Sequence, residues 1–203
     1  MINRRLLLIP ALMMMLTANA QERSSDPLGP ITECIQRDGF RYQKKDRLPV
    51  AARFRSVNTS AGPVQVSTAD GYRLMLYRKS SSPLVNLKLE RSADGRFAAD
   101  RAAITAQLTA MAAATKPPHQ VRLETSALNG VEVLALNNPG IERAPGIISM
   151  YTLMDAASGT VATAYLLNQR PEIREYATDA EYAALRDRFI GLLGACMGTP
   201  NNG

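Results

Sequence analysis

The 203-residue chain has no tryptophan, a single histidine, two cysteines and few aromatic residues. The missing tryptophan argues against sugar binding by stacking on large aromatic side chains. The lone histidine, His119, follows two prolines and has no nucleophile or carboxylate at a catalytic spacing, so we interpret it as a solvated loop residue. One histidine and two cysteines also leave too few nitrogen and sulfur ligands for an ordinary zinc site.

Catalytic motifs are missing as well. The chain has no H-E-x-x-H, G-x-S-x-G, phosphate-binding loop or EF-hand spacing. Glu172, Glu175 and Asp179 are close in sequence, but Arg170 and Arg174 lie among them, which is typical of a mixed-charge surface and not of an acid/base pair. We therefore predict that the protein is not an enzyme and uses no cofactor or metal ion. A hydrolase whose centre works without histidine is the open alternative.

The one long apolar run lies at the start of the chain. A short basic segment precedes uncharged apolar residues over 6–16 and small residues over 17–20. This order is typical of a secretory signal peptide, cleaved between Ala20 and Gln21. The run has about half the length that a membrane span needs, so a retained anchor is the weaker alternative. We predict a periplasmic or secreted protein without a stable membrane anchor.

The two cysteines, Cys34 and Cys196, lie near opposite ends of the chain. Two such residues in one domain usually pair in an oxidising compartment, so we predict a Cys34–Cys196 disulfide. A redox pair is an alternative that the wide spacing disfavours, because redox cysteines usually form a C-x-x-C motif. Two buried free thiols are the other alternative.

Three pairs of segments with alternating apolar residues predict antiparallel hairpins. Asn129-Gly130 is the strongest turn signal among them, and Asp70-Gly71 predicts another turn after a short strand at 64–66. In the segment 84–91 we expect the odd-numbered side chains to face the core, and Lys88 and Glu90 to face water. The paired segments are 72–78 with 84–91, 121–127 with 131–136, and 147–155 with 160–168.

Two segments follow helical spacing. The first, 97–114, ends before prolines and has Asp94 or Asp100 as a candidate cap. The second follows a capping box formed by Thr178 and Glu181. We expect both helices to cover one face of the sheet.

These elements predict the α+β class, an antiparallel sheet with an internal helix and a C-terminal helix packed on it. We expect one domain over 31–198, a flexible leader over 21–30 and a disordered tail over 199–203. The order of elements over 72–196 is similar to that of PsbP-like secreted domains. The resemblance implies a layered sandwich, and that family includes many non-enzymatic accessory proteins.

A basic segment follows the first cysteine. Residues 37–55 hold seven basic and two acidic residues, with aromatic residues between them. Such a patch speeds encounter with acidic partners, and we expect Arg41, Lys44, Lys45 and Arg47 to provide this steering. Outside the cytoplasm nucleic acid is a poor candidate, whereas acidic proteins, anionic lipids and lipopolysaccharide phosphates are better ones. The alternative is a solvated edge strand that charge protects from aggregation.

The loop 137–146 contains two Pro-Gly pairs around a tip formed by Ile141, Glu142 and Arg143. A stiff loop with an exposed apolar residue loses little entropy on docking, so we predict that this tip contacts a partner. An ordinary connection between two hairpins is the alternative.

Together these features predict a non-enzymatic periplasmic domain that binds another protein with an acidic surface. An inhibitor or immunity protein against a secreted toxin or lytic enzyme would fit this description. The alternative is a cell-envelope accessory protein that binds anionic lipid or an outer-membrane complex.

Overall fold

The computed structural model describes residues 26–117, 120–144 and 146–198. The predictions made for 1–20, His119 and 199–203 lie outside these residues. The helices are α1 (Gly29–Cys34), α2 (Phe97–Ala114) and α3 (Asp179–Gly198). The strands are β1 (Arg41–Arg47), β2 (Phe54–Thr59), β3 (Gly62–Tyr77), β4 (Val85–Ser92), β5 (Arg122–Leu128), β6 (Val131–Asn137), β7 (Ile147–Asp155) and β8 (Thr160–Leu167). Four short 3₁₀ segments are η1 (Arg37–Gly39), η2 (Val50–Arg53), η3 (Ile141–Arg143) and η4 (Pro171–Ile173).

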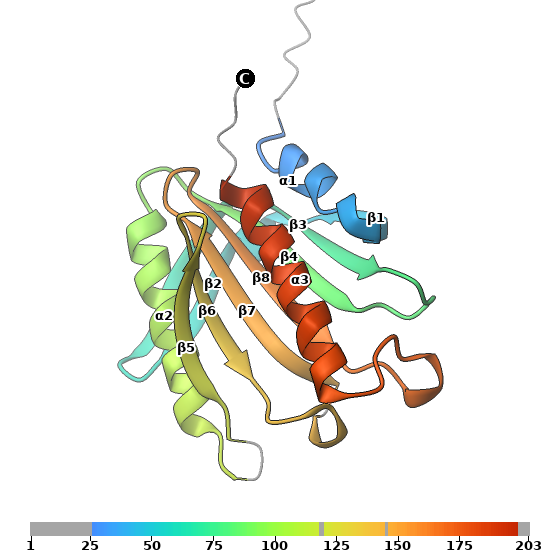
Figure 1. The fold of residues 1–203 in the computed structure, drawn as a ribbon. Helices are drawn as coiled ribbons and strands as arrows, with labels where there is room; N and C mark the ends of the chain where they lie inside the picture. Colours follow the sequence, from blue (N-terminus) through green and yellow to red (C-terminus); the bar gives the residue numbers. More distant parts are fainter. Residues whose placement is uncertain (1–25, 118–119, 145, 199–203) are drawn as a thin grey trace, which may run out of the picture.

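The strands form one antiparallel sheet in the order β1-β3-β4-β8-β7-β6-β5, and β2 pairs with the first half of β3 (Figure 1). The long helices α2 and α3 pack on this sheet, which confirms the predicted α+β class. The three predicted hairpins are also confirmed. At the β5–β6 turn Asn129 and Gly130 both have positive φ, 52° and 82°, as a type I′ turn requires.

The two long helices lie on opposite faces of the sheet, so the prediction that they share one face was wrong. Residues of α3 and α1 pack against one face, and residues of α2 pack against the other. The cause is the composition of β7 and β8, which are buried along almost their whole length on both sides. Strands that are apolar on both faces need a cover on each, and one helix cannot provide it.

The helix ends follow the predicted signals in part. At α3 the Glu181 N–H donates to Thr178 Oγ1 (3.2 Å), and the Glu181 carboxylate accepts from the Ala177 N–H (2.6 Å). Thr178 therefore caps the helix as predicted, but Glu181 reaches the N–H of Ala177 and not that of Thr178, so the predicted capping box is present only in part. At α2 the prediction was wrong, because the helix begins after Arg96 without a side-chain cap and Asp100 is buried inside its first turn.

The predicted turn at Asp70-Gly71 does not exist, because β3 continues through both residues. A register shift between Thr68 and Asp70 bends the strand there. Gly71 serves close packing instead of a turn. A Cβ atom at this position would lie 2.6 Å from Leu48 Cδ1 and 2.7 Å from the Leu89 carbonyl oxygen.

Residues 26–40 pack on the domain, so the predicted flexible leader over 21–30 includes residues that belong to the fold; its first part, 21–25, lies outside the described residues. Leu28 is completely buried, and α1 begins at Gly29. Cys34 at the end of α1 is bonded to Cys196 in α3, with 5.6 Å between their Cα atoms, which confirms the predicted disulfide.

We expect the Gly71→Ala variant to lose about 1–3 kcal/mol of unfolding free energy, because the added methyl group meets both a side chain and backbone. Urea denaturation measures this loss. Gly191→Ala is the matched control, since a Cβ atom there meets nothing within 4 Å and alanine favours the helix. Equal stability of the two variants would contradict the packing argument.

Removal of the disulfide should lower the unfolding free energy by about 2–5 kcal/mol, because the bond closes a very long loop in the unfolded chain. Urea midpoints with and without dithiothreitol test this. The Cys34→Ala/Cys196→Ala double variant should have the urea midpoint of the reduced protein, and dithiothreitol should not change it. An unchanged midpoint on reduction would show that the bond does not stabilise the fold.

Candidate functional site

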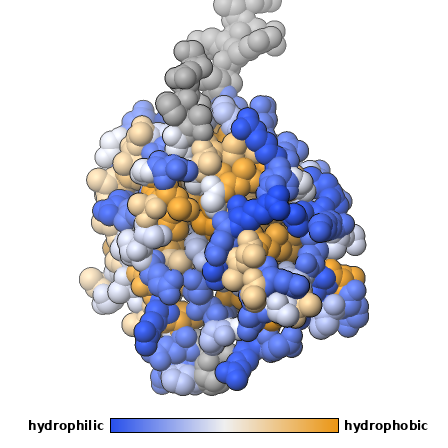
Figure 2. All heavy atoms as spheres, viewed as in Figure 1, coloured by the Kyte–Doolittle hydropathy of each residue, from blue (hydrophilic) through white to orange (hydrophobic). Residues whose placement is uncertain are grey.

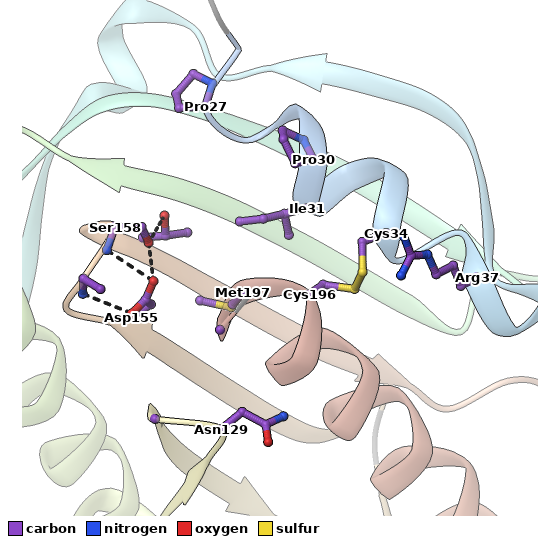
Figure 3. A pocket seen from close by; sticks show the side chains of 14 residues that line it. Pro27, Pro30, Ile31, Cys34, Arg37, Asn129, Asp155, Ser158, Cys196 and Met197 are labelled. Atoms are coloured by element: carbon purple, nitrogen blue, oxygen red, sulfur yellow. Dashed lines mark hydrogen bonds between the residues drawn. A yellow bond between two sulfur atoms is a disulfide. The ribbon is translucent and has the colours of Figure 1, made fainter. Parts of the chain in front are cut away.

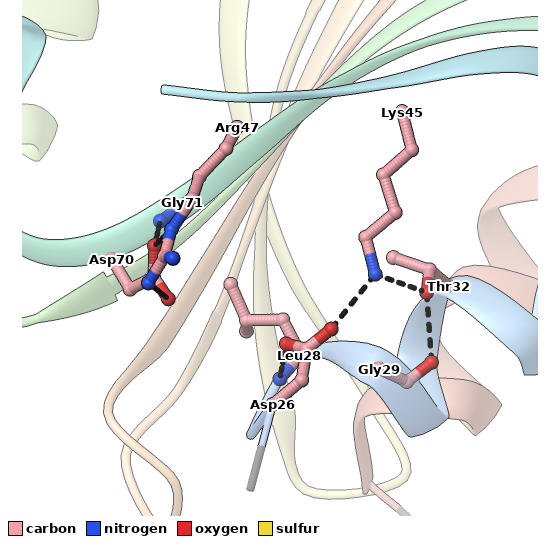
Figure 4. Close-up of polar contacts among 8 residues, drawn as sticks. All are labelled: Asp26, Leu28, Gly29, Thr32, Lys45, Arg47, Asp70 and Gly71. Carbon is pink, nitrogen blue, oxygen red and sulfur yellow. Dashed lines mark hydrogen bonds and ion pairs between the residues drawn. The ribbon is translucent and has the colours of Figure 1, made fainter. Parts of the chain in front are cut away.

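The basic strand β1 lies at the edge of the sheet. Two of its predicted steering residues, Lys45 and Arg47, form ion pairs with carboxylates of the same chain (Figure 4). Lys45 donates to Asp26 (2.8 Å) and to Thr32 Oγ1 (3.2 Å). Arg47 makes a bidentate pair with Asp70, at 3.0 and 2.9 Å. Lys45 therefore ties the segment before α1 to the sheet, and Arg47 is neutralised in place.

The other two steering residues stay at the surface. The Arg41 guanidinium donates to the Arg78 carbonyl oxygen. Lys44 and Asp46 form an exposed pair at 2.9 Å. Much of the positive charge on β1 is thus balanced by neighbouring carboxylates, which leaves less of it to attract a partner.

The loop tip predicted to dock a partner is held against the domain. Ile141 is only 2% exposed, so its prediction as an exposed docking residue was wrong. Its N–H donates to Asp179 (2.8 Å), and its carbonyl oxygen accepts from the Asn168 side chain (3.0 Å). Glu142 is exposed and pairs with Arg174 (2.9 Å), and Arg143 is exposed. The tip and β1 do not form one surface, because β3, β4 and β8 separate β1 from β7.

A second set of basic side chains gathers on the sheet face that α2 covers in part. Arg73 and Lys88 are direct cross-strand neighbours on β3 and β4. Arg55 reaches them from β2 and approaches Glu90 to 3.4 Å. Glu90 also accepts from Lys88 (2.7 Å) and from Thr68 (2.9 Å). We call Arg55, Arg73 and Lys88 the basic cluster.

The basic cluster carries three positive charges around Glu90, and Asp46, the neighbour of Arg73 on β1, is itself paired with Lys44. Glu90 is 3% exposed, so the expectation that it faces water was wrong. Burial lowers the pKa of Lys88, and the charges of Arg55 and Arg73 act in the same direction against the attraction of Glu90. The Arg55 Nε atom is buried and has no hydrogen-bond partner. The cluster therefore holds more positive charge than Glu90 balances, which favours an added anion.

Sequence reasoning missed this cluster. Arg55 was assigned to the basic segment, and Lys88 to a solvated face. A usable signal was present, because Lys88 and Glu90 are two apart and so share one side of a strand. The signal did not reveal Arg73, whose position beside Lys88 depends on the register between β3 and β4.

A separate cleft of about 650 Å³ lies between α1, the end of α3 and two hairpin turns (Figure 3). The disulfide, Ile31 and Met197 form part of its wall. The carboxylate that lines the cleft, that of Asp155, already accepts hydrogen bonds from the Ala157 N–H (3.0 Å) and the Ser158 hydroxyl (2.5 Å). The cleft therefore offers apolar contacts, while its acidic group is engaged in its own turn.

Two further searches concern the described residues as a whole. Among them no three or more histidine, cysteine, aspartate or glutamate side chains come together as a possible metal site. None of the helices within the described ranges has the length and apolar character to cross a membrane.

Comparisons with known proteins identified no relative of this chain. No protein-family model, curated protein or solved structure matches the chain. The similarity to PsbP-like domains thus stays a prediction from element order, and the site has to be interpreted from its own chemistry.

The Asp26–Lys45 contact should make stability depend on pH. Burial opposes ionisation of Asp26, but the hydrogen bond and charge of Lys45 outweigh it and lower the Asp26 pKa. A lowered carboxylate pKa stabilises the fold above the ordinary value and loses that effect as pH falls through the folded value. Asp26→Asn should therefore cost about 1 kcal/mol at pH 7 and nothing at strongly acidic pH.

Urea titrations from neutral to acidic pH check this expectation. Asp46→Asn is the control, because the exposed Lys44–Asp46 pair should contribute almost nothing at any pH. A loss at Asp26 that is the same at all pH values would contradict the role of its charge.

Proposed function

We propose that this chain is a binding domain without catalytic activity, that it works outside the cytoplasm, and that it recognises an acidic group of another protein through the basic cluster. The observation that supports this most directly is the charge imbalance at Arg55, Arg73 and Lys88. A partner carboxylate would supply the missing negative charge and accept hydrogen bonds from the exposed Arg73 guanidinium.

The position of the cluster favours this assignment over β1. Lys88 is 15% exposed at its side chain and Arg55 28%, so both lie where water screens charge less than at the open surface. Lys88 and Arg55 share the one carboxylate of Glu90, whereas on β1 Lys44 and Arg47 pair with different carboxylates. A docking anion gains more from charges that are partly buried and not yet balanced.

The partial burial of Lys88 and Arg55 favours a protein side chain or terminus over a membrane. A bilayer presents headgroups on a broad plane, which protruding cations reach best. The Arg73 side chain is exposed, whereas the side chains of Lys88 and Arg55 are partly buried in the protein surface. An inhibitor or immunity protein against a secreted toxin or lytic enzyme would use such a site, and binding of anionic lipid at the envelope is the second candidate.

A fluorescent hexaglutamate peptide tests the cluster by anisotropy at low salt. Arg73→Gln should weaken binding about tenfold, because one charge-assisted contact is lost without breaking an internal ion pair. Arg41→Gln removes the same charge from β1 and should leave the affinity within about twofold. An equal loss in both variants would show that only net charge matters.

Vesicles containing phosphatidylglycerol separate the two candidates. The acidic-protein proposal predicts no Arg73-dependent binding to these vesicles. Vesicle binding that Arg73→Gln abolishes, without peptide binding, would favour the envelope function instead.

A further inference from the structure

The two edges of the sheet differ in how they are protected. β1 has a register shift between Tyr42 and Lys45, carries Lys44 as well as Lys45, and is followed by Pro49. Irregularity, lysine and proline are the usual devices that prevent an edge from pairing with another chain. β5, the last strand at the other edge, has none of them: its register with β6 is continuous, and residues 124–127 are all exposed.

The hairpin geometry tells which backbone groups of β5 point outward. Leu128 and Val131 flank the two-residue turn and therefore exchange both backbone hydrogen bonds. Pairing alternates along the strand, so the N–H and C=O groups of Leu123, Thr125 and Ala127 point away from β6. No hydrogen bond within the described residues takes up these groups.

The helix next to this edge also lacks charge on its outer side. Between Phe97 and Ala114 the charged residues are Asp100, which is buried, and Arg101, which pairs with Glu132 of β6 at 2.5 Å. Met111 is 43% exposed. Other exposed positions are occupied by Ala98, Ala102, Thr109, Ala113 and Ala114.

The helix and the strand form one side of the molecule. α2 contacts β5, and Figure 1 shows them next to each other. Figure 2 shows apolar residues mixed with hydrophilic ones on the same side of the molecule. A helix that is apolar or neutral around most of its circumference is usually covered.

We propose that the β5 edge and the outer side of α2 bind a second copy of this chain about a two-fold axis. The β5 strands would pair antiparallel with Thr125 facing Thr125, which joins the two sheets into one. In this register Glu124 faces Ser126 and Arg122 faces Leu128, so no like charges oppose each other. Three facing pairs of outward residues each exchange two backbone hydrogen bonds.

The low net charge of the β5 edge and of the outer side of α2 favours a second copy of this chain as the binding partner. Arg122 and Glu124 balance each other on β5, and Arg101 is already paired with Glu132. A nearly neutral side matches an equally neutral one, which a second copy supplies in the self-complementary form that two-fold dimers need. Arg73 and Lys88 of the basic cluster lie on β3 and β4, which β6, β7 and β8 separate from the β5 edge, so these two residues remain open in the pair; Arg55 lies on β2, which also contacts α2.

Analytical ultracentrifugation of the purified protein, from about 1 to 100 μM, tests the proposal. We expect a dimer at the upper concentrations. Thr125→Lys should weaken dimerisation at least tenfold, since two lysines then face each other at the axis, and Thr125→Glu should do the same. Gln43→Lys, an equal change on the protected edge, should leave the dimer intact.

Mixing the Thr125→Lys and Thr125→Glu proteins distinguishes repulsion at the proposed strand pairing from misfolding of the variants. Lysine then faces glutamate, so the mixture should form a heterodimer as tightly as the parent protein does. A misfolded variant cannot be rescued in this way. Three results would overturn the proposal. The parent protein could stay monomeric at about 100 μM, Thr125→Lys could leave the affinity of the dimer unchanged, or the mixture of the two variants could form no heterodimer. None of these results affects hexaglutamate binding, which tests the basic cluster separately.

Discussion

The structure depends on one constraint, which is that β7 and β8 are apolar on both faces and have to be covered on both. α3 and α1 cover one face, and the disulfide holds this pair of helices together. α2 covers the other face together with β2, and the apolar cluster there includes Val57 of β2, Val66 of β3 and Tyr165 of β8. Lys88 and Arg73 lie on the same face but outside this cluster, so the boundary of the apolar layer determines where charge can gather.

That boundary explains why the candidate site has its composition. Glu90 lies at the margin of the apolar layer, where a carboxylate is unfavourable unless donors surround it. Thr68, Lys88 and Arg55 supply those donors. The donors bring more positive charge than one carboxylate balances, and Arg73 adds to the excess. The surplus is thus the result of stabilising a buried acid with cations from β2 and β4 next to Arg73 of β3.

Local signals were sufficient for much of the fold. Asn129-Gly130 places a hairpin because both residues accept positive φ, and Thr178 with Glu181 places a helix end through their own hydrogen bonds. Long-range effects were not accessible in the same way. Gly71 has the composition of a turn, but its role depends on Leu48, and the burial of Ile141 depends on a carboxylate of α3. The basic cluster likewise arises only after the strands have paired, since its members come from three of them.

The bond between Cys34 and Cys196 has a mechanical consequence. It links positions 162 residues apart, and the whole sheet lies within the loop that it closes. A pulling force applied at Asp26 and Gly198 would pass through the sulfur–sulfur bond and leave the sheet unloaded. Only the few residues outside the two cysteines could extend under tension. The oxidised chain should thus behave under load as a short, stiff connector, and the reduced chain as a domain that unravels.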